Sequence, residues 1–296
     1  MEKEKIVLYA MTQKGFEVLR ALTKLMGPQF IDFVVSSRDN HIANDYFEDI
    51  KKYCLSNDIS FFQREDQPEP RTEFAIAISW RWIIKLETTK LIVLHDSLLP
   101  RFRGFAPLVT GLINGEKELG VTALYASEQY DKGEIIAQQK MDVHYPVTIA
   151  AVIKSITSLY VLIAGDLAKK MKANIPLHSR PQDEQQATYS LWLDDSDYFI
   201  DWSMSADHIR RFIDAVGYPY KGACSWDGEK ICRILEAEVE SDVMIENRCP
   251  GKLIFINENE PVVVCGSGLL RIKNITDDKG NSLLPLKKFR TRYCNR

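Results

Sequence analysis

A histidine that ends an apolar run is the first candidate for chemistry in this sequence. His95 follows the run 90–94, which is apolar after Lys90, and opens the stretch His-Asp-Ser-Leu-Leu-Pro-Arg-Phe-Arg-Gly, in which Pro100 and Gly104 are typical turn residues. An imidazole can accept or donate a proton near neutral pH, and a nearby carboxylate can orient its ring. Such a histidine can equally be a polar cap of a strand, so the rest of the chain has to decide.

Ser97 and Asp131 could act together with this histidine. Ser97 follows it by two residues, where its hydroxyl could be a nucleophile, although a serine in such a turn more often binds its own backbone. Asp131 lies in the loop Tyr-Asp-Lys-Gly-Glu, where a carboxylate is either a solvated turn residue or the partner of a catalytic histidine. The pattern favours the turn role for Ser97 and leaves both roles open for Asp131.

An aromatic and cationic run forms a third group. It comprises Trp80, Arg81 and Trp82, directly after the apolar residues 74–79. These side chains could pack at the end of a strand, or they could form a wall for a flat heterocyclic ligand.

Five short apolar runs alternate with helical segments in the first 95 residues. The runs are residues 6–10, 30–36, 59–62, 74–79 and 90–94. The alternation predicts a parallel sheet covered by helices, in which ligands bind at the carboxyl ends of the strands. His95 and the tryptophan run both stand at such ends. No GxGxxG or GxxxxGK[ST] pattern follows the first run, so neither a nicotinamide dinucleotide nor a P-loop is indicated.

The remaining segments predict the rest of the α/β domain and a second, smaller domain. A helix over residues 107–114, paired strands over 121–125 and 134–143, and a long amphipathic helix over 148–172 complete the first domain. We expect this domain to span residues 1–176, with a polar linker over 177–190. Residues 191–296 contain a capped helix over 205–216 and five short β-like runs, which predict an α+β domain with a small barrel.

Composition limits the partners of the chain. The net charge is −3, and residues 191–296 carry 15 Lys and Arg against 17 Asp and Glu, so nucleic acid is not an expected partner. The six cysteines are scattered without CxxC pairs, which argues against a zinc site and favours a reducing compartment. The N-terminal apolar run is too short for a signal peptide or a membrane span. We therefore expect a cytoplasmic protein without a metal.

Several blocks of this sequence resemble the folate-dependent formyltransferases. Residues 95–104, His-x-Ser-Leu-Leu-Pro-x-x-x-Gly, are similar to the signature of that family, and residues 131–138, Asp-Lys-Gly-Glu-Ile-Ile-Ala-Gln, are similar to a second block. Residues 112–116, 120–122, 187–189, 200–203 and 218–223 continue the resemblance in order. The last three blocks resemble the linker and C-terminal domain shared by methionyl-tRNA and sugar-nucleotide formyltransferases.

The resemblance implies a fold, a reaction and a set of site residues. It implies a Rossmann-like first domain, an OB-like second domain, and transfer of a formyl group from the co-substrate N10-formyltetrahydrofolate to a primary amine. His95 and Asp131 match the catalytic histidine and aspartate. The positions that it implies for cofactor binding are Trp80, Arg81, Trp82, Ser97, Leu98, Leu99, Pro100, Tyr130 and Gly133. The positions that it implies for substrate binding are Arg103, Gly104 and Phe105.

One position departs from the family pattern. The family places an asparagine two residues before the catalytic histidine, and this chain has Val93 there. Loss of one donor to a tetrahedral oxyanion typically costs about 2.7–4 kcal/mol of barrier. Three interpretations follow: a protonated His95 with water or a backbone N–H replaces the donor, Asp96 or another polar group reshapes the site, or the chain has another donor or no transfer activity.

The acceptor is predicted from what the chain lacks. Methionyl-tRNA formyltransferases usually carry a basic insertion after the second strand, and residues 36–45 are short here and without a Lys/Arg cluster. The pattern is therefore most similar to the bacterial enzymes that formylate TDP- or UDP-linked amino sugars for surface polysaccharides. The alternatives are methionyl-tRNA as acceptor and a non-catalytic or altered-donor protein. A homodimer is a further expectation.

Overall fold

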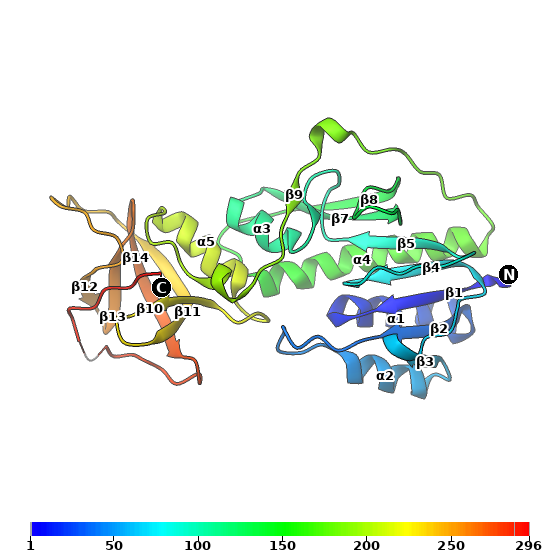
Figure 1. The fold of residues 1–296 in the computed structure, drawn as a ribbon, viewed down its shortest axis with the longest axis horizontal. Helices are drawn as coiled ribbons and strands as arrows, with labels where there is room; N and C mark the ends of the chain where they lie inside the picture. The colour runs from blue at the N-terminus through cyan, green and yellow to red at the C-terminus, as the bar shows by residue number, and fades with distance from the viewer. Residues whose placement is uncertain (1, 287, 296) are drawn as a thin grey trace. The chain divides into compact units, whose positions relative to one another are not determined.

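The apolar runs of the first 95 residues form the parallel part of a seven-stranded sheet (Figure 1). The structure is a computed structural model that describes residues 2–286 and 288–295. The strands are β1 (Glu2–Ala10), β2 (Ile31–Ser36), β3 (Ser60–Gln63), β4 (Thr72–Ile78), β5 (Lys90–His95), β7 (Glu118–Tyr125) and β8 (Ile135–Asp142). Their order is β3-β2-β1-β4-β5-β7-β8, and only the pairs β5–β7 and β7–β8 are antiparallel. This confirms the mostly parallel, Rossmann-like sheet.

Three helices cover one face of this sheet. They are α1 (Thr12–Met26), α2 (Phe47–Ser56) and α4 (Ile149–Lys172). Phe16 of α1 contacts Tyr53 of α2, and Lys14 of α1 lies over the ring of Tyr160 of α4. Among the described helices, α4 is long and apolar enough to cross a membrane, but Ile156, Tyr160 and other residues of its apolar face are buried. This burial is typical of a core helix.

The opposite face of the sheet is covered by irregular chain. Alternate residues of β1, β2 and β4 form a buried apolar cluster there, which includes Tyr9 and Ala77. Trp80, Ile84 and Leu86 of the segment 79–89 pack on this cluster in place of a helix. The face that carries the tryptophan run is therefore closed by a loop, which leaves room for a cavity.

The chain divides into two compact units, each built from more than one segment of the sequence. The first unit comprises the residues as far as Pro107, with Glu118–Asp142 and Val152–Leu191. The second comprises Leu108–Lys117, which contains most of α3 (Pro107–Asn114), together with Val143–Ala151 and the chain from Trp192 onward. In the first unit, residues of the expected linker form β9 (Tyr189–Ser190), which pairs with β6 (Arg103–Gly104).

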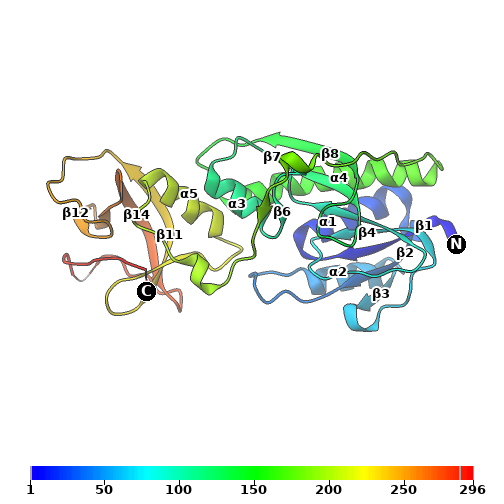
Figure 2. The same ribbon diagram turned by 45° about the horizontal axis from the view of Figure 1, so that its top comes forward.

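The second unit contains a five-stranded antiparallel sheet and a capped helix (Figure 2). The strands are β10 (Ala223–Trp226), β11 (Ile231–Glu240), β12 (Leu253–Asn257), β13 (Glu260–Val264) and β14 (Leu269–Asp277). Helix α5 (Ala206–Val216) begins after Ser205, whose hydroxyl accepts a hydrogen bond from the backbone N–H of His208, and it packs on β11. Short 3-10 turns complete the chain, namely η1 (Pro28–Phe30), η2 (Arg64–Asp66), η3 (Glu184–Gln186) and η4 (Asp195–Tyr198).

The C-terminal segment, residues 288–295, is hydrogen-bonded to both edges of this second sheet. Cys294 exchanges backbone hydrogen bonds with Trp226 of the edge strand β10. At the other edge, Thr291 accepts a hydrogen bond from the backbone N–H of Leu253 of β12. The segment therefore closes the sheet partly into a barrel, which agrees with the predicted small β domain.

Candidate functional site

His95 is the last residue of β5, at the carboxyl edge of the parallel strands. Its side chain is buried, and its Nε2 atom lies 2.8 Å from the backbone oxygen of Phe102. Because a carbonyl oxygen only accepts hydrogen bonds, Nε2 carries the proton and donates it. The Nδ1 atom is then the nitrogen that is left for acid–base chemistry.

Asp131 reaches this histidine from the loop between β7 and β8. One carboxylate oxygen, Oδ2, accepts a hydrogen bond of 2.8 Å from the backbone N–H of Gly104, and the other, Oδ1, lies 3.6 Å from Nδ1 of His95. This separation exceeds a hydrogen bond, so the two atoms face one another without being joined. The structure thus brings the predicted histidine and aspartate together.

Val93 lies on the same face of β5 as His95, because side chains alternate along a strand. It is half-buried and packs against the cluster around Tyr9 and against a second cluster of Leu99, Leu124 and Ile135. An isopropyl group in this apolar position donates no hydrogen bond. The position where the resemblance implies an asparagine is therefore part of the hydrophobic core.

The predicted Ser97–Pro100 stretch is held by its own turn and by β7. The Ser97 hydroxyl donates a hydrogen bond of 2.7 Å to the backbone oxygen of Arg101, which is the turn role that the sequence favours. Thr122 of β7 donates to the backbone oxygen of Ser97 and accepts from the N–H of Leu99. The Leu99 side chain is buried in the core. Cofactor contacts by these residues stay a prediction.

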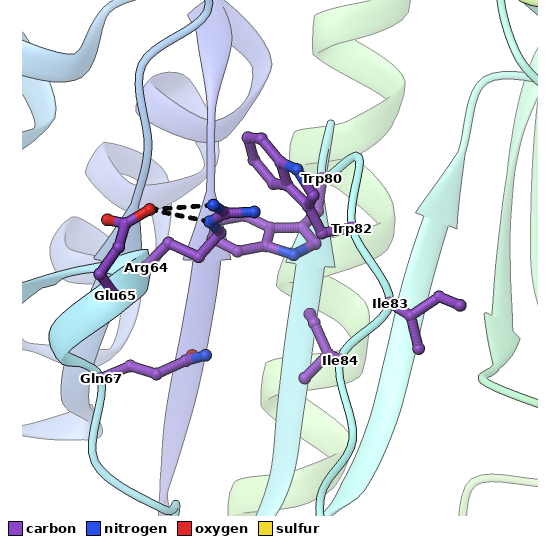
Figure 3. Close-up of a pocket in the computed structure, with 7 residues that line it drawn as sticks. All are labelled: Arg64, Glu65, Gln67, Trp80, Trp82, Ile83 and Ile84. Carbon is purple, nitrogen blue, oxygen red and sulfur yellow. Dashed lines mark hydrogen bonds and ion pairs between the residues drawn. The ribbon is translucent and has the colours of Figure 1, made fainter.

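Trp80 and Trp82 of the tryptophan run line a cavity of about 310 Å³ (Figure 3). Its other lining residues are Arg64, Glu65, Gln67, Ile83 and Ile84. The guanidinium of Arg64 stacks over the ring of Trp82 at 4.3 Å, and Trp80 meets Trp82 edge to face. The Nε1 atom of Trp80 is buried and has no hydrogen-bond partner. Aromatic faces beside a cation and an unpaired donor are suited to a flat, polar heterocycle.

Arg81 and the residues that follow the signature turn have other surroundings. Arg81 forms an ion pair with the buried carboxylate of Asp39 at 2.5 Å. Phe105 and Tyr130 are both exposed and their rings lie 5.8 Å apart, so they can contact a ligand. Gly133 packs directly against the backbone of Tyr125. A Cβ atom at this position would lie 1.7 Å from the Tyr125 backbone oxygen, so a side chain does not fit there.

Arg103, one of the positions implied for substrate binding, is held by the protein itself. Its side chain is fully buried, and its guanidinium donates hydrogen bonds to Gln182, Glu184 and Tyr189. The hydrogen bonds with Glu184 raise the pKa of Arg103 and lower the pKa of that glutamate. With these partners the guanidinium faces protein, so its predicted contact with substrate stays a prediction.

A charged pair lies on the helical side of His95, and only its aspartate was indicated by the sequence. Lys14 forms an ion pair of 2.5 Å with Asp96, and one oxygen of Asp96 is buried without a partner. Burial, followed by the charge of Asp96, raises the pKa of Tyr160 well above its usual value. The position of Asp96 beside the candidate histidine was a usable signal, whereas Lys14 resembles an ordinary polar residue of a helix.

No three His, Cys, Asp or Glu side chains gather as possible metal ligands in the described part of the chain.

Comparisons with known proteins cover both units. A family model described as formyl transferase matches residues 77–159, and one described as formyl transferase, C-terminal domain, matches residues 193–291. The methionyl-tRNA formyltransferase of Thermodesulfovibrio yellowstonii is 31% identical over 222 residues, which are 73% of this chain and 69% of the relative. That of Heliobacterium modesticaldum is 28% identical over 65% of this chain, which spans only 62% of that relative.

One of the similar solved structures is not named as a methionyl-tRNA formyltransferase. The N-formyltransferase of Helicobacter canadensis, solved with folinic acid and dTDP-3-aminofucose, matches with a TM-score of 0.69 and 16% identity. The match covers 90% of this chain and 98% of the other. At this identity the likeness shows the fold.

Proposed function

We propose the function of this chain from one premise, which is that the chain belongs to the folate-dependent formyltransferase family. It is therefore a formyltransferase, an enzyme that transfers a one-carbon group. The donor that we propose is N10-formyltetrahydrofolate. The acceptor that we propose is the primary amine of a TDP- or UDP-linked amino sugar, for surface polysaccharide synthesis in the cytoplasm.

The facing pair of His95 and Asp131 is the observation that carries the proposal. In the reaction the amine nitrogen bonds to the formyl carbon, the bond between that carbon and N10 breaks, and one proton passes from the amine to N10. Nδ1 of His95 and Oδ1 of Asp131 lie 3.6 Å apart, close enough to take up and return this proton together. Because Oδ2 of Asp131 already accepts a hydrogen bond from the Gly104 N–H, Oδ1 is the oxygen that faces Nδ1 of His95 and can exchange the proton with it.

The negative charge that develops on the formyl oxygen needs a donor other than residue 93. Val93 is apolar and surrounded by apolar side chains. We propose that His95, protonated by the attacking amine, stabilises this charge together with water or a backbone N–H. The proton on His95 then serves both as the stabilising charge and as the proton that N10 receives.

We propose that the cavity beside the tryptophans binds the pterin of the donor. A pterin is flat, aromatic and rich in hydrogen-bonding groups, which suits stacking against Trp82 and an acceptor atom for the unpaired Nε1 of Trp80. The ion pair with Asp39 directs Arg81 to the protein rather than to a ligand.

Charge supports a small acceptor over transfer RNA. Several cations of the second unit are paired with carboxylates; Arg271, for example, contacts Glu238, Glu240 and Glu260. After β2, Arg38 is paired with Asp45 and Glu48. Binding of a nucleic acid depends on unpaired cations that can displace counterions from its phosphates. Methionyl-tRNA remains the second candidate, because the curated relatives are named for it.

An acceptor screen tests the proposal. Purified protein is incubated with N10-formyltetrahydrofolate and a panel of TDP- and UDP-linked amino sugars, and mass spectrometry records the gain of one formyl group. We expect one sugar to be formylated, and His95→Ala to lower kcat by about 10²-fold or more. Turnover of methionyl-tRNA with no sugar product would overturn the sugar assignment. Full activity of His95→Ala would overturn the role of the histidine.

A further inference from the structure

The segment that was expected to be a linker is bonded along the candidate site. We call residues 179–190 the strap. Arg180 exchanges backbone hydrogen bonds with Ile135 of β8, at 2.8 and 2.9 Å. Further along, the strap accepts the N–H groups of Arg103 and Phe105, which follow the signature turn. The strap thus contacts β8, which follows the Asp131 loop, and the segment 102–104, to which both His95 and Asp131 are hydrogen-bonded.

Arg103 fixes the orientation of one strap side chain, Gln182. Its Nε and Nη2 atoms donate to the Oε1 atom of Gln182 at 3.1 and 2.8 Å. Glu184 holds the other side of the same buried guanidinium at 2.7 and 2.9 Å. Because Oε1 of Gln182 is occupied by these donors, the NH₂ group of the amide must face the other way.

That NH₂ group binds the backbone of the Asp131 loop. Nε2 of Gln182 donates to the backbone oxygen of Asp131 at 2.7 Å and to that of Gly133 at 2.8 Å. Asp131 has a φ of +54°, a left-handed conformation that few non-glycine residues adopt. A residue keeps such a conformation when its surroundings hold it there. The two hydrogen bonds from Gln182 hold the backbone carbonyl groups of Asp131 and Gly133, the residues on either side of Lys132.

We propose that Gln182, oriented by the buried Arg103, is a positioning residue that holds Asp131 in line with His95. The backbone of Asp131 is held by Gln182 and its Oδ2 atom by the Gly104 N–H, so that Oδ1 is directed to Nδ1 of the histidine. This inference rests on the proposed function, because it assigns Asp131 a part in proton transfer. It also gives Arg103 a role in the scaffold of the site.

The first test exchanges one atom of Gln182. Gln182→Glu keeps an oxygen for Arg103 and removes the NH₂ group that binds the Asp131 loop. We expect kcat to fall about 10- to 100-fold, because small misplacements of a catalytic group have effects of this size, with KM for both substrates within about twofold. Gln186→Glu is the matched control, since Gln186 lies on the same strap and its side chain donates a hydrogen bond to Asp183 rather than to the Asp131 loop. We expect this control to have wild-type kinetics.

The second test asks whether Gln182 acts through Asp131. In the Asp131→Asn background, Gln182→Glu should lower kcat by less than about twofold further, because residues that act as a unit are not additive. Additive losses, or a change in KM alone, would overturn the positioning role. Gln182→Met serves as a second variant that lacks the NH₂ group, so that a folding failure of one variant does not decide the result.

A third measurement does not depend on activity. Hydrogen exchange of the Gly104 amide reports its bond to Asp131, and we expect this amide to exchange at least about tenfold faster in Gln182→Glu than in Gln186→Glu. If the wild-type protein formylates no acceptor, the proposed function fails, while this measurement still decides whether Gln182 positions Asp131. Equal exchange rates in the two variants would overturn the inference.

Discussion

Val93 occupies the position at which the family pattern places a hydrogen-bond donor. It stands two residues before His95 on the same face of β5, and its apolar neighbours come from two separate core clusters. An amide at this position would add a hydrogen-bond donor beside the histidine, at the cost of placing a polar group among apolar side chains. Catalysis and stability are therefore opposed at this residue.

We expect Val93→Asn to be faster and less stable than the wild type. A restored oxyanion donor should raise kcat by about tenfold or more, because removal of such donors typically lowers kcat by 10²- to 10³-fold. The partly unsatisfied amide should lower the free energy of unfolding by about 1–3 kcal/mol. Steady-state kinetics and urea unfolding measure the two effects.

A smaller apolar residue provides the control for this experiment. Val93→Ala also removes packing but adds no donor, so we expect a loss of stability with kcat within about twofold of the wild type. A folded Val93→Asn variant with unchanged kcat would show that the oxyanion is already fully stabilised in the wild type. An inactive wild type that becomes active as Val93→Asn would favour a non-catalytic family member.

Among the elements, the C-terminal segment is the one that the sequence did not explain. Tyr293 is buried, its ring stacks on that of Trp202 at 5.7 Å, and burial raises the pKa of its hydroxyl group. Its backbone N–H donates to the oxygen of Gly251, next to the edge strand β12. The segment is therefore part of the core of the second unit.

Truncation of Tyr293 should destabilise that unit. We expect Tyr293→Ala to lower its free energy of unfolding by about 3–5 kcal/mol, the usual cost of removing a large buried aromatic side chain. Urea unfolding followed by tryptophan fluorescence measures this, since Trp202 lies against the altered residue. Phe289→Ala, at an exposed position of the same segment, is the control and should change stability by less than about 0.5 kcal/mol. Equal losses in the two variants would contradict the core role.

The elements that sequence patterns predicted are those with strong local signals. The alternation of apolar runs predicted the parallel strands, and Ser205 marked the start of α5. The C-terminal segment has no such signal, because its pairing depends on strands that are distant in sequence. For the candidate site, the signature turn predicted His95, but nothing local marks Gln182, whose partners Arg103 and Asp131 lie far away along the chain. Contacts of this kind arise from the tertiary fold alone.

For the whole molecule, the pH dependence of stability depends on carboxylates that folding removes from water. Asp214 of α5 is such a group: burial raises its pKa to about 6, although Arg210 forms an ion pair with it at 2.6 Å. Glu236 adds a smaller effect in the same direction. The folded state thus holds a proton on Asp214 more tightly than the unfolded state, whose ordinary value is 3.8.

This difference predicts the direction in which pH changes stability. Below pH 3.8 both states are protonated at Asp214; between 3.8 and about 6 only the unfolded state ionises, so stability falls as pH rises through this window and stays lowered above it. Asp214→Asn removes the titration. We expect the wild type to lose about 1–3 kcal/mol relative to this variant between about pH 4.5 and 7.5, measured by urea unfolding of both proteins. Because the comparison subtracts every other titrating group, a constant difference across this range would mean that Asp214 titrates alike in both states.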